Sequence, residues 1–275
     1  MTHRIAVIGT GFTPAGSKAP PAEIAAVAGA GFAPELIETT LSVFPGTPYE
    51  RGLCVLGYVE TGIRAAEQGY AAAFINTVGD YGIDELRSAV AIPVVGAGEA
   101  AMTVATTLGR RFAIVTIWPT KLNFIYDERI RSCRMNERCI GVFNVLANDE
   151  MTMRGDDTDP VAGMRSGKQA MIDRIVRVAD QAVAAGADTI VLGCTCMAPI
   201  GARIAARMAV PVVEAMTAGY KYAEALVGLK LSHSAAAYPR AAADRLTLAR
   251  DLVAGAGVAA QAEDCEVCVV ATAAE

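Results

Sequence analysis

The sequence contains an internal repeat, which limits the chain to folds built from two similar halves. The segment AEQGYAAAFINT at residues 66–77 has a counterpart in VAAGADTIVLGC at residues 183–194. Two shorter segments repeat in the same order: RIAVI at 4–8 with RFAIV at 111–115, and PVV at 93–95 with PVV at 211–213. Matches that keep one order along the chain indicate two copies of an α/β unit.

Both copies alternate short apolar segments with amphipathic ones. Buried-strand patterns occur at residues 5–8, 36–43, 71–75 and 92–95, and again at 112–116, 139–146, 189–192 and 210–213. Helical patterns occur at 22–31, 49–69, 84–89, 99–108, 120–133, 168–185, 198–208, 215–229 and 240–255. Residues 148–163 are polar and predict a loop, and the residues after 257 specify little.

Strands that alternate with helices of this length favour parallel sheets joined by crossover helices. We therefore predict an α/β fold with two pseudo-symmetric Rossmann-like lobes and an active site in the cleft between them. Lobe 1 spans residues 1–103 and is completed by residues 215–275, while lobe 2 spans residues 104–214. In this arrangement Thr77 and Cys194 address a small molecule from opposite faces.

Composition excludes several classes of partner. The chain has 275 residues, 53% of them hydrophobic, but its apolar runs are of strand length and fall short of the ~20 residues that a membrane span needs. The amino terminus lacks the apolar stretch of a signal peptide, so we expect a cytoplasmic protein. The net charge of −5 and the absence of a basic stretch argue against nucleic acid. Seven cysteines are an odd count, and we expect free thiols.

Polar residues gather where the predicted strands end. Ligands of open parallel sheets bind beyond the carboxyl ends of the strands. Such ends are occupied by Gly9–Thr10, Asn76–Thr77, Gly96–Glu99, Thr116–Trp118, Gly193–Thr195 and Glu214. This convergence predicts that a small-molecule site lies there.

Cys194 is the strongest candidate for chemistry, because it follows a strand and precedes a helix. The positive end of the helix dipole should lower its pKa below the ~8.5 of a free cysteine. A thiolate there would act as a base toward a C–H acid or as a nucleophile. The backbone N–H groups of Thr195 and Cys196 would hold a substrate carboxylate. The alternative is that Cys194 is a small buried apolar residue.

The sequence resembles the aspartate/glutamate/hydantoin racemase superfamily over most of residues 1–230. Gly-Cys-Thr at 193–195 is similar to the motif that carries the second cysteine of that superfamily. Residues 77–82 (TVGDYG) resemble the segment that carries the first cysteine in hydantoin-racemase-like members, and residues 93–101 (PVVGAGEAA) resemble the next strand and helix of those members. The resemblance implies cofactor-independent chemistry, in which two thiols exchange a Cα proton on opposite faces of the substrate.

Thr77 departs from this two-cysteine pattern, because it stands where the first cysteine would be. A threonine hydroxyl is a far weaker acid than a thiol. The superfamily offers three interpretations: a Thr/Cys pair that favours one enantiomer, a one-cysteine decarboxylase of arylmalonate type, or a protein that has lost activity. A structural alternative is that Thr77 caps the next helix.

Other strand-end residues are candidates for substrate binding. Asn76 offers an amide to a carboxylate or an imide carbonyl, although turn chemistry explains it equally. Thr10 and Gly11 would form a backbone nest for an anion. Thr116 would provide a hydroxyl, and Trp118 either lines the pocket or packs in the core. The helix-start carboxylates Glu99 and Glu214 are interpreted as structural.

No cofactor or metal is predicted. The pair Cys265 and Cys268 forms a CxxC in the tail, but a structural zinc site needs about four ligands and the chain has only His3 and His233. The acidic cluster at 156–159 is interpreted as solvated loop carboxylates. Nucleotide-binding glycine motifs do not follow the first strand.

The sequence thus predicts a cofactor-independent racemase or epimerase that acts on a small carboxylate or a cyclic imide or ureide of hydantoin type. Cys194 serves as acid and base, and Thr77 with Asn76 acts or binds on the other side. The alternatives are the one-cysteine decarboxylase, a maleate-type cis–trans isomerase, and a silent protein that binds small acids. A homo-oligomer is expected.

Overall fold

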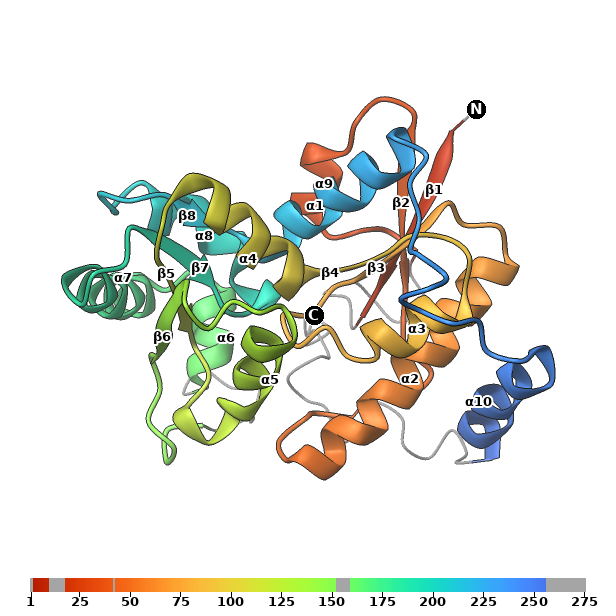
Figure 1. Ribbon diagram of the computed structural model, residues 1–275. Coiled ribbons are helices and arrows are strands. Elements are labelled where there is room, and N and C mark those ends of the chain that lie inside the picture. Colours follow the sequence, from red (N-terminus) through yellow and green to blue (C-terminus); the bar gives the residue numbers. More distant parts are fainter. Residues whose placement is uncertain (1, 10–17, 42, 152–158, 256–275) are drawn as a thin grey trace, which may run out of the picture. The chain divides into compact units, whose positions relative to one another are not determined.

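Each half of the chain forms one four-stranded parallel sheet (Figure 1). The first sheet has the order β2-β1-β3-β4, made of Phe32–Ile37, His3–Ile8, Ala72–Ile75 and Val94–Gly96. The second has the order β6-β5-β7-β8, made of Cys139–Asn144, Phe112–Thr116, Thr189–Leu192 and Val212–Val213. Because the order is the same in both, the predicted α/β fold with two pseudo-symmetric lobes is confirmed.

The structure is a computed structural model that describes residues 2–9, 18–41, 43–151 and 159–255. The chain divides into two compact units, numbered 1–76, 80–96 and 219–275 for the first, and 77–79 and 97–218 for the second. The lobe boundaries predicted after residues 103 and 214, and the placement of the active site between the lobes, stay predictions.

The helices alternate with the strands, as the sequence predicts. Those before β5 are α1 Ala22–Val27, α2 Pro48–Glu67, α3 Ile83–Ala89 and α4 Ala97–Leu108. Those after β5 are η1 Thr120–Leu122, α5 Phe124–Ser132, α6 Pro160–Arg165, α7 Gln169–Ala184, η2 Thr195–Met197, α8 Ala198–Ala205, α9 Ala215–Gly228 and α10 Ala243–Gly255.

The first sheet is buried because helices cover both of its faces. In Figure 1, α1 and α9 lie on one face, and α2 and α3 on the other. Strand β3 is buried along its whole length, and its Phe74 meets the ring of Tyr220 on α9 edge-on, with the centroids 6.5 Å apart. A sheet covered on both faces requires apolar residues on both sides of each strand, which explains the continuous apolar runs in the sequence.

Helices α4 and α9 are exchanged between the units in a reciprocal way. Helix α4 follows β4 of the first sheet but belongs to the second unit, where it contacts β5, β7 and β8. Helix α9 follows β8 of the second sheet, and from Gly219 onward it belongs to the first unit. There Glu224 accepts the N–H of Gly29 at 2.8 Å, beside the ring contact of Tyr220. The two halves therefore repeat in connectivity as well as in strand order.

The second sheet packs against the amphipathic helix α7. This helix contacts β5, β6 and β7 and buries the apolar face predicted from the sequence, with Ile172, Ile175, Ala179 and Ala182 almost fully enclosed. The period of these residues matches the turn of an α-helix, so the helix has one apolar face and one solvated face.

Three elements differ most from the sequence prediction, while others, such as the helix predicted at 22–31, end a few residues earlier. The second strand is Phe32–Ile37, not 36–43, and it contains Pro34, which an edge strand tolerates because its N–H side faces away from the sheet. The predicted helix at 120–133 is divided into η1 and α5. The predicted loop at 148–163 ends in α6, which begins where Asp159 accepts the N–H of Val161 at 2.8 Å and Pro160 takes the first helical position.

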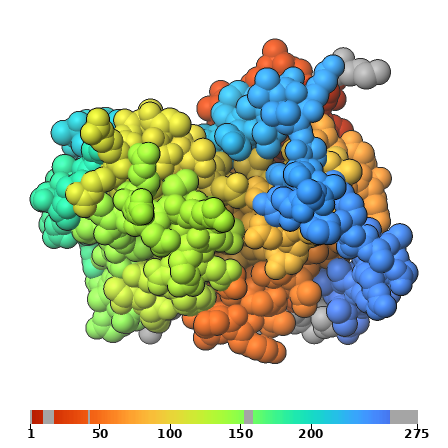
Figure 2. Space-filling model, in the orientation of Figure 1, coloured from red at the N-terminus to blue at the C-terminus, as the bar shows by residue number. Residues whose placement is uncertain are grey.

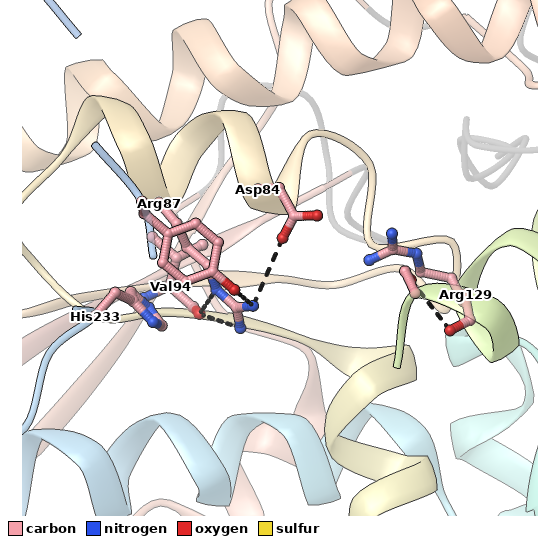
Figure 3. Close-up of polar contacts among 7 residues, drawn as sticks. Asp84, Arg87, Val94, Arg129 and His233 are labelled. Carbon is pink, nitrogen blue, oxygen red and sulfur yellow. Dashed lines mark hydrogen bonds and ion pairs between the residues drawn. The ribbon is translucent and has the colours of Figure 1, made fainter. Parts of the chain in front are cut away.

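The segment after α9 is bonded to α3 and β4 of the first unit, and the buried side chain of Arg87 is central to this contact. Arg87 of α3 donates to the carbonyl of Val94 at 3.1 and 3.3 Å and to the hydroxyl of Tyr238 at 3.2 Å, and it lies 3.8 Å from Asp84 (Figure 3). His233 accepts the N–H of Val94 at 2.7 Å through Nε2. Both backbone groups of Val94 at the sheet edge are therefore bonded to side chains.

Helix α10 continues this attachment. It contacts α2, and Arg250 forms an ion pair with Glu67 at 2.6 Å. In Figure 2 the blue residues of this segment cover part of the orange surface of the first unit. None of the described helices is long and apolar enough to cross a membrane.

Candidate active site

Thr77 and Cys194 occupy equivalent positions, each two residues beyond the third strand of its copy. Strand β3 ends at Ile75 and β7 at Leu192. The residue after each strand donates its backbone N–H to the neighbouring central strand at 2.8 Å: Asn76 to Ile8, and Gly193 to Val115. The repeat predicted from the sequence therefore extends to single hydrogen bonds at the strand ends. Both Thr77 and Cys194 belong to the second unit.

Cys194 is half-buried and has an extended backbone, with φ −146° and ψ 133°. The 3-10 turn η2 begins directly after it, and its Sγ accepts the N–H of Cys196 at 3.2 Å. Because Cys194 is only half-buried, it is not the fully buried small apolar residue that the alternative interpretation requires. The N–H of Cys196, predicted to hold a substrate carboxylate, instead points to this sulfur.

The expectation of free thiols is wrong for this pair, because Cys194 and Cys196 form a disulfide. The extended residue followed by a tight turn brings the two Cα atoms to 5.1 Å, which lies within the usual range for a disulfide. The signal was present in the sequence as a Cys-Thr-Cys spacing. Among the described residues, Cys54, Cys133 and Cys139 form no disulfide, and burial raises the pKa of Cys139 to about 11.

The side-chain hydroxyl of Thr77 makes no hydrogen bond within the described residues. Its side chain is half-buried, and its Oγ1 is enclosed with no hydrogen-bond partner among the described residues. A buried hydroxyl without a partner costs free energy on the order of 1–3 kcal/mol, so natural proteins rarely keep one without reason. The interpretation of Thr77 as a helix cap receives no hydrogen bond here, whereas a ligand would satisfy the hydroxyl.

Asn76 and Thr195 are both buried beside these positions. Asn76 is 5% exposed, and a Cβ placed on Gly9 would lie 3.4 Å from the Cβ of Asn76. Thr195 is 8% exposed and begins η2. Two further candidates, Thr10 and Gly11, lie outside the described residues, as do Asp156, Asp157 and the pair Cys265 and Cys268.

Thr116 lies at the end of β5, but its hydroxyl is directed into the protein. It is fully buried and lies 2.6 Å from the hydroxyl of Tyr126, and it accepts the N–H of Trp118 at 3.2 Å. The Tyr126 hydroxyl in turn donates to the carbonyl of Gly193 at 2.8 Å. The predicted hydroxyl donor of the site is thus engaged beneath Cys194.

Tyr126 was not predicted from the sequence. It lies on α5, where it looks like any aromatic residue on the buried face of a helix, and it contacts Gly193 from 67 positions away. Burial raises its pKa well above the usual value, so the phenol stays protonated. Only the spatial contact identifies it.

Trp118 is half-buried, and its backbone is fixed on both sides. Its N–H is bonded to Thr116, and its carbonyl accepts the side-chain amide of Asn144 at 2.9 Å. The segment after β5 therefore has little freedom, as expected of residues that shape a site on a rigid strand end.

Glu214 has a structural role. Glu214 accepts the N–H groups of Met216 and Thr217 at 2.7 and 2.8 Å, and so caps the start of α9. Within the described ranges, no group of at least three histidine, cysteine, aspartate or glutamate side chains is placed to hold a metal ion.

Comparison with known proteins identifies the relatives of the chain. A family model described as Asp/Glu/Hydantoin racemase matches residues 15–223. A hydantoin racemase of Rhizobium meliloti is 34% identical over 187 residues, which are 65% of this chain and 70% of the relative. A hydantoin racemase of Pseudomonas sp. (strain NS671) is 28% identical over 185 residues, 66% of this chain and 68% of the relative.

A solved structure of a racemase is also similar to this chain. The structure of an allantoin racemase from Klebsiella pneumoniae has a TM-score of 0.73 to this chain at 25% identity. The match covers 88% of this chain and 96% of the other. The similarity therefore extends over nearly the whole of that racemase.

Proposed function

The chain belongs to the Asp/Glu/hydantoin racemase family, and from that premise we propose that it is a cofactor-independent isomerase that moves the Cα proton of a hydantoin-like ring through Cys194. Small carboxylates, the other substrate class predicted from the sequence, are the second choice. The observation that carries the proposal is that Cys194 lies half-buried at the carboxyl end of β7, in a chain whose curated relatives are hydantoin racemases.

The relatives support this choice of substrate class. Hydantoin and allantoin share a five-membered cyclic ureide ring with one carbon that carries a hydrogen, a substituent and an adjacent carbonyl. Loss of that hydrogen as a proton leaves an enolate, whose charge rests on the carbonyl oxygen. A thiolate whose basicity is matched to this C–H acid removes the proton, and the thiol returns it.

Cys194 performs this step in its reduced form. Reduction of the Cys194–Cys196 disulfide by a dithiol adds two electrons and two protons and releases both sulfurs as thiols. The N–H of Cys196 that lies against the Cys194 sulfur would then stabilise negative charge on it, because hydrogen bonds to charged acceptors are the stronger ones.

Thr77 acts on the other face of the ring. Its unsatisfied hydroxyl, with the amide of the neighbouring Asn76, holds a carbonyl of the substrate or passes a proton to and from water. Because a threonine hydroxyl is not a base at neutral pH, the step on this face is the slower one. The protein is therefore a one-thiol variant of the family reaction.

The test is proton exchange in D2O with protein reduced beforehand. Each enantiomer of a 5-substituted hydantoin is incubated near neutral pH, the ring C–H signal is followed by NMR, and optical rotation is recorded in parallel. We expect deuterium uptake with loss of rotation in the wild type, and neither above the enzyme-free rate in Cys194→Ser. Cys133→Ser is the matched control, because it removes a thiol from the end of α5 and leaves the strand ends unchanged.

Parallel incubations with amino acids and with arylmalonates separate the remaining candidates. A one-cysteine decarboxylase is favoured by Thr77, since decarboxylation leaves a carbanion that needs a single proton donor. Deuterium that enters only as a malonate loses CO2 would establish that reaction in place of racemisation. Binding of a ring or acid without exchange would identify a silent binding protein, and turnover of maleate alone a cis–trans isomerase.

Two further expectations accompany the proposal. We expect a homo-oligomer, which light scattering after size-exclusion chromatography would detect, and a cytoplasmic location, which fractionation of cells would test. Neither affects the assignment of Cys194.

A further inference from the structure

A buried chain of hydrogen bonds lies beneath the strand end that carries Cys194. Trp118, Thr116, Tyr126 and Gly193 are linked at 3.2, 2.6 and 2.8 Å in that order, all within the second unit. Tyr126 is 2% exposed, and Thr116 is completely buried. Water cannot replace either hydroxyl, so the chain depends on these side chains alone.

The direction of the protons in this chain is fixed. The Gly193 carbonyl has no proton, so Tyr126 donates to it. The single Tyr126 proton is then used, and Thr116 must donate to the tyrosine oxygen. Thr116 in turn accepts from the N–H of Trp118. Each donor polarises the next bond in such a chain, which strengthens the final one.

Gly193 is held on both sides. Its N–H donates to Val115 at 2.8 Å, and its carbonyl accepts from Tyr126. A side chain cannot be added, since a Cβ at Gly193 would lie 2.8 Å from the Cβ of Thr116 and 2.8 Å from the Cγ2 of Ile114. The peptide group between Gly193 and Cys194 is planar, so fixing its carbonyl also fixes the direction in which the Cys194 backbone begins.

From this geometry we infer that Tyr126 is a positioning residue for Cys194, which it aims by donating its hydroxyl proton to the carbonyl of Gly193. The inference rests on the proposed function, in which Cys194 carries the proton. Phenylalanine would fill the same volume, so the hydroxyl is the group that distinguishes positioning from packing. General acid–base steps require a heavy-atom approach near 3 Å, so a small rotation of Cys194 is costly.

The experiment compares reduced wild type with Tyr126→Phe. The kcat for inversion of the hydantoin should fall about tenfold, as expected when a buried carbonyl loses its donor, while KM changes little because the ring is bound by other groups. The rate at which iodoacetamide alkylates Cys194, followed by mass spectrometry of the Cys194 peptide, should fall in parallel. Tyr70→Phe is the matched control, since it removes a buried tyrosine hydroxyl that donates to Glu35 in the first unit.

Variants of Thr116 test the same chain from its other end. Thr116→Val should cause a smaller loss than Tyr126→Phe and add nothing to it in the double variant, because Thr116 acts through the tyrosine. Thr116→Ser keeps the hydroxyl and should recover most of the loss. This Val and Ser pair carries the test if Tyr126→Phe does not fold.

The outcomes are separable. If Tyr126→Phe is folded and keeps both kcat and the alkylation rate within about twofold of wild type, the positioning role is overturned. If the wild type inverts no ring at all, the proposed function fails, and the alkylation rates of Cys194 still decide whether Tyr126 positions it.

Discussion

At the residue scale, Cys194 has two oxidation states, a disulfide and a thiol, that exclude each other. As a disulfide with Cys196 its sulfur carries no exchangeable proton, and as a thiol it is the proposed acid and base. The two states differ only in a bond between residues two positions apart. The redox state of one short turn therefore decides whether the proposed reaction occurs.

The first prediction concerns this turn. Protein oxidised to the Cys194–Cys196 disulfide should show almost no exchange or inversion of the ring, and incubation with dithiothreitol should restore both, because only the thiol moves a proton. Cys196→Ser cannot form the disulfide and should be active without reductant. Equal activity of oxidised and reduced wild type, measured by NMR exchange, would contradict this dependence.

The second prediction concerns the opposite face of the ring. Thr77→Cys places a thiol on the face that we propose to be opposite Cys194, so it should raise the rate of inversion up to about 100-fold, the usual scale of an added acid–base group. Thr77→Val, which has a similar shape and no hydroxyl, should lower it. Polarimetry on the reduced variants measures both, and a Thr77→Cys variant slower than wild type would count against the assignment of this face.

The sequence predicted Cys194 and Thr77 because both lie in the repeat, where comparison of the copies marks them. It did not predict Tyr126, whose role depends on a contact with Gly193 across 67 positions. It assigned Thr116 correctly to a strand end, but it did not indicate which way the hydroxyl points. The hydrophobic period of the sequence is enough to predict where strands and helices occur. The direction of a single side chain depends on tertiary packing, which the period does not describe.

At the element scale, helix α2 packs closely against the backbone of Leu41 at a position where it has a glycine. A Cβ at Gly57 would lie 2.5 Å from the carbonyl oxygen of Leu41, whereas a Cβ at Gly52 in the same helix meets nothing within 4 Å. The two positions share a helix and differ in their surroundings. They therefore form a matched pair for measuring close packing.

The third prediction uses this pair. Gly57→Ala should destabilise the protein by about 1–3 kcal/mol, because the new methyl group collides with backbone that cannot move aside. Gly52→Ala should stabilise it by about 0.5–1 kcal/mol through helix propensity. Urea unfolding followed by circular dichroism measures both, and an equal effect of the two changes would show that the contact with Leu41 is not limiting.

A cluster of three polar side chains links strands β1 and β2 of the first sheet. Arg4 on β1 donates to both oxygens of Glu35 on β2, at 2.7 and 3.0 Å, and the Tyr70 hydroxyl donates to the same carboxylate at 2.7 Å. The hydrogen bond from Arg4 is the main reason that the pKa of Glu35 is lowered to about 2. A carboxyl with a lowered folded pKa stabilises the fold above its unfolded pKa and loses this effect as pH falls through the folded value.

The fourth prediction follows from that sign. The Tm difference between wild type and Glu35→Gln should be constant above a pH of about 4.5 and should shrink as pH falls toward about 2, since protonated Glu35 resembles glutamine. Differential scanning fluorimetry across this range measures it, with Glu23→Gln on α1 as the control. A difference independent of pH would mean that the carboxylate charge contributes nothing.

Prediction of the elements succeeded where periodicity was strong and failed where proline or capping decided. Helix α7 followed directly from its apolar face. Strand β2 was shifted because Pro34 argues against a strand, and only its edge position permits it. The start of α6 was missed because acidic residues precede it, although Asp159 followed by Pro160 is a start signal.

At the scale of the whole molecule, the two copies keep the same strand order but not the same chemistry. Cys194 has a sulfur atom where its counterpart Thr77 has a hydroxyl, so the pseudo-symmetry of the fold is broken at the atoms that we propose to react. The equilibrium constant of a racemisation is one, so the kcat/KM values for the two enantiomers must still be equal. Asymmetry can still appear in the separate kcat and KM values, and most directly in the comparison of exchange with inversion.

The fifth prediction uses this comparison. The enantiomer whose hydrogen faces Cys194 should take up deuterium faster than it inverts, because the thiol can remove a proton and return a deuteron on the same face. The other enantiomer should invert nearly each time it exchanges, since Cys194 completes a step that began slowly near Thr77. Initial rates from NMR and chiral chromatography measure both ratios, and equal ratios would indicate equivalent groups on both faces.

The two strand ends also differ in how large and small residues are paired beside Thr77 and Cys194. Just before Thr77, Asn76 lies beside Gly9, and just before Cys194, Gly193 lies beside Thr116. Each pair holds one glycine and one larger residue, but the glycine follows β1 in the first pair, whereas in the second pair it follows β7, the counterpart of β3. A side chain added at Gly193 would collide with Thr116. At Gly9, by contrast, an added Cβ would lie 3.4 Å from the Cβ of Asn76, so the two strand ends differ in how closely their pairs are packed. A design that enlarges Gly193 must therefore reduce Thr116 in the same variant, so the residue before Cys194 cannot be altered independently of β5.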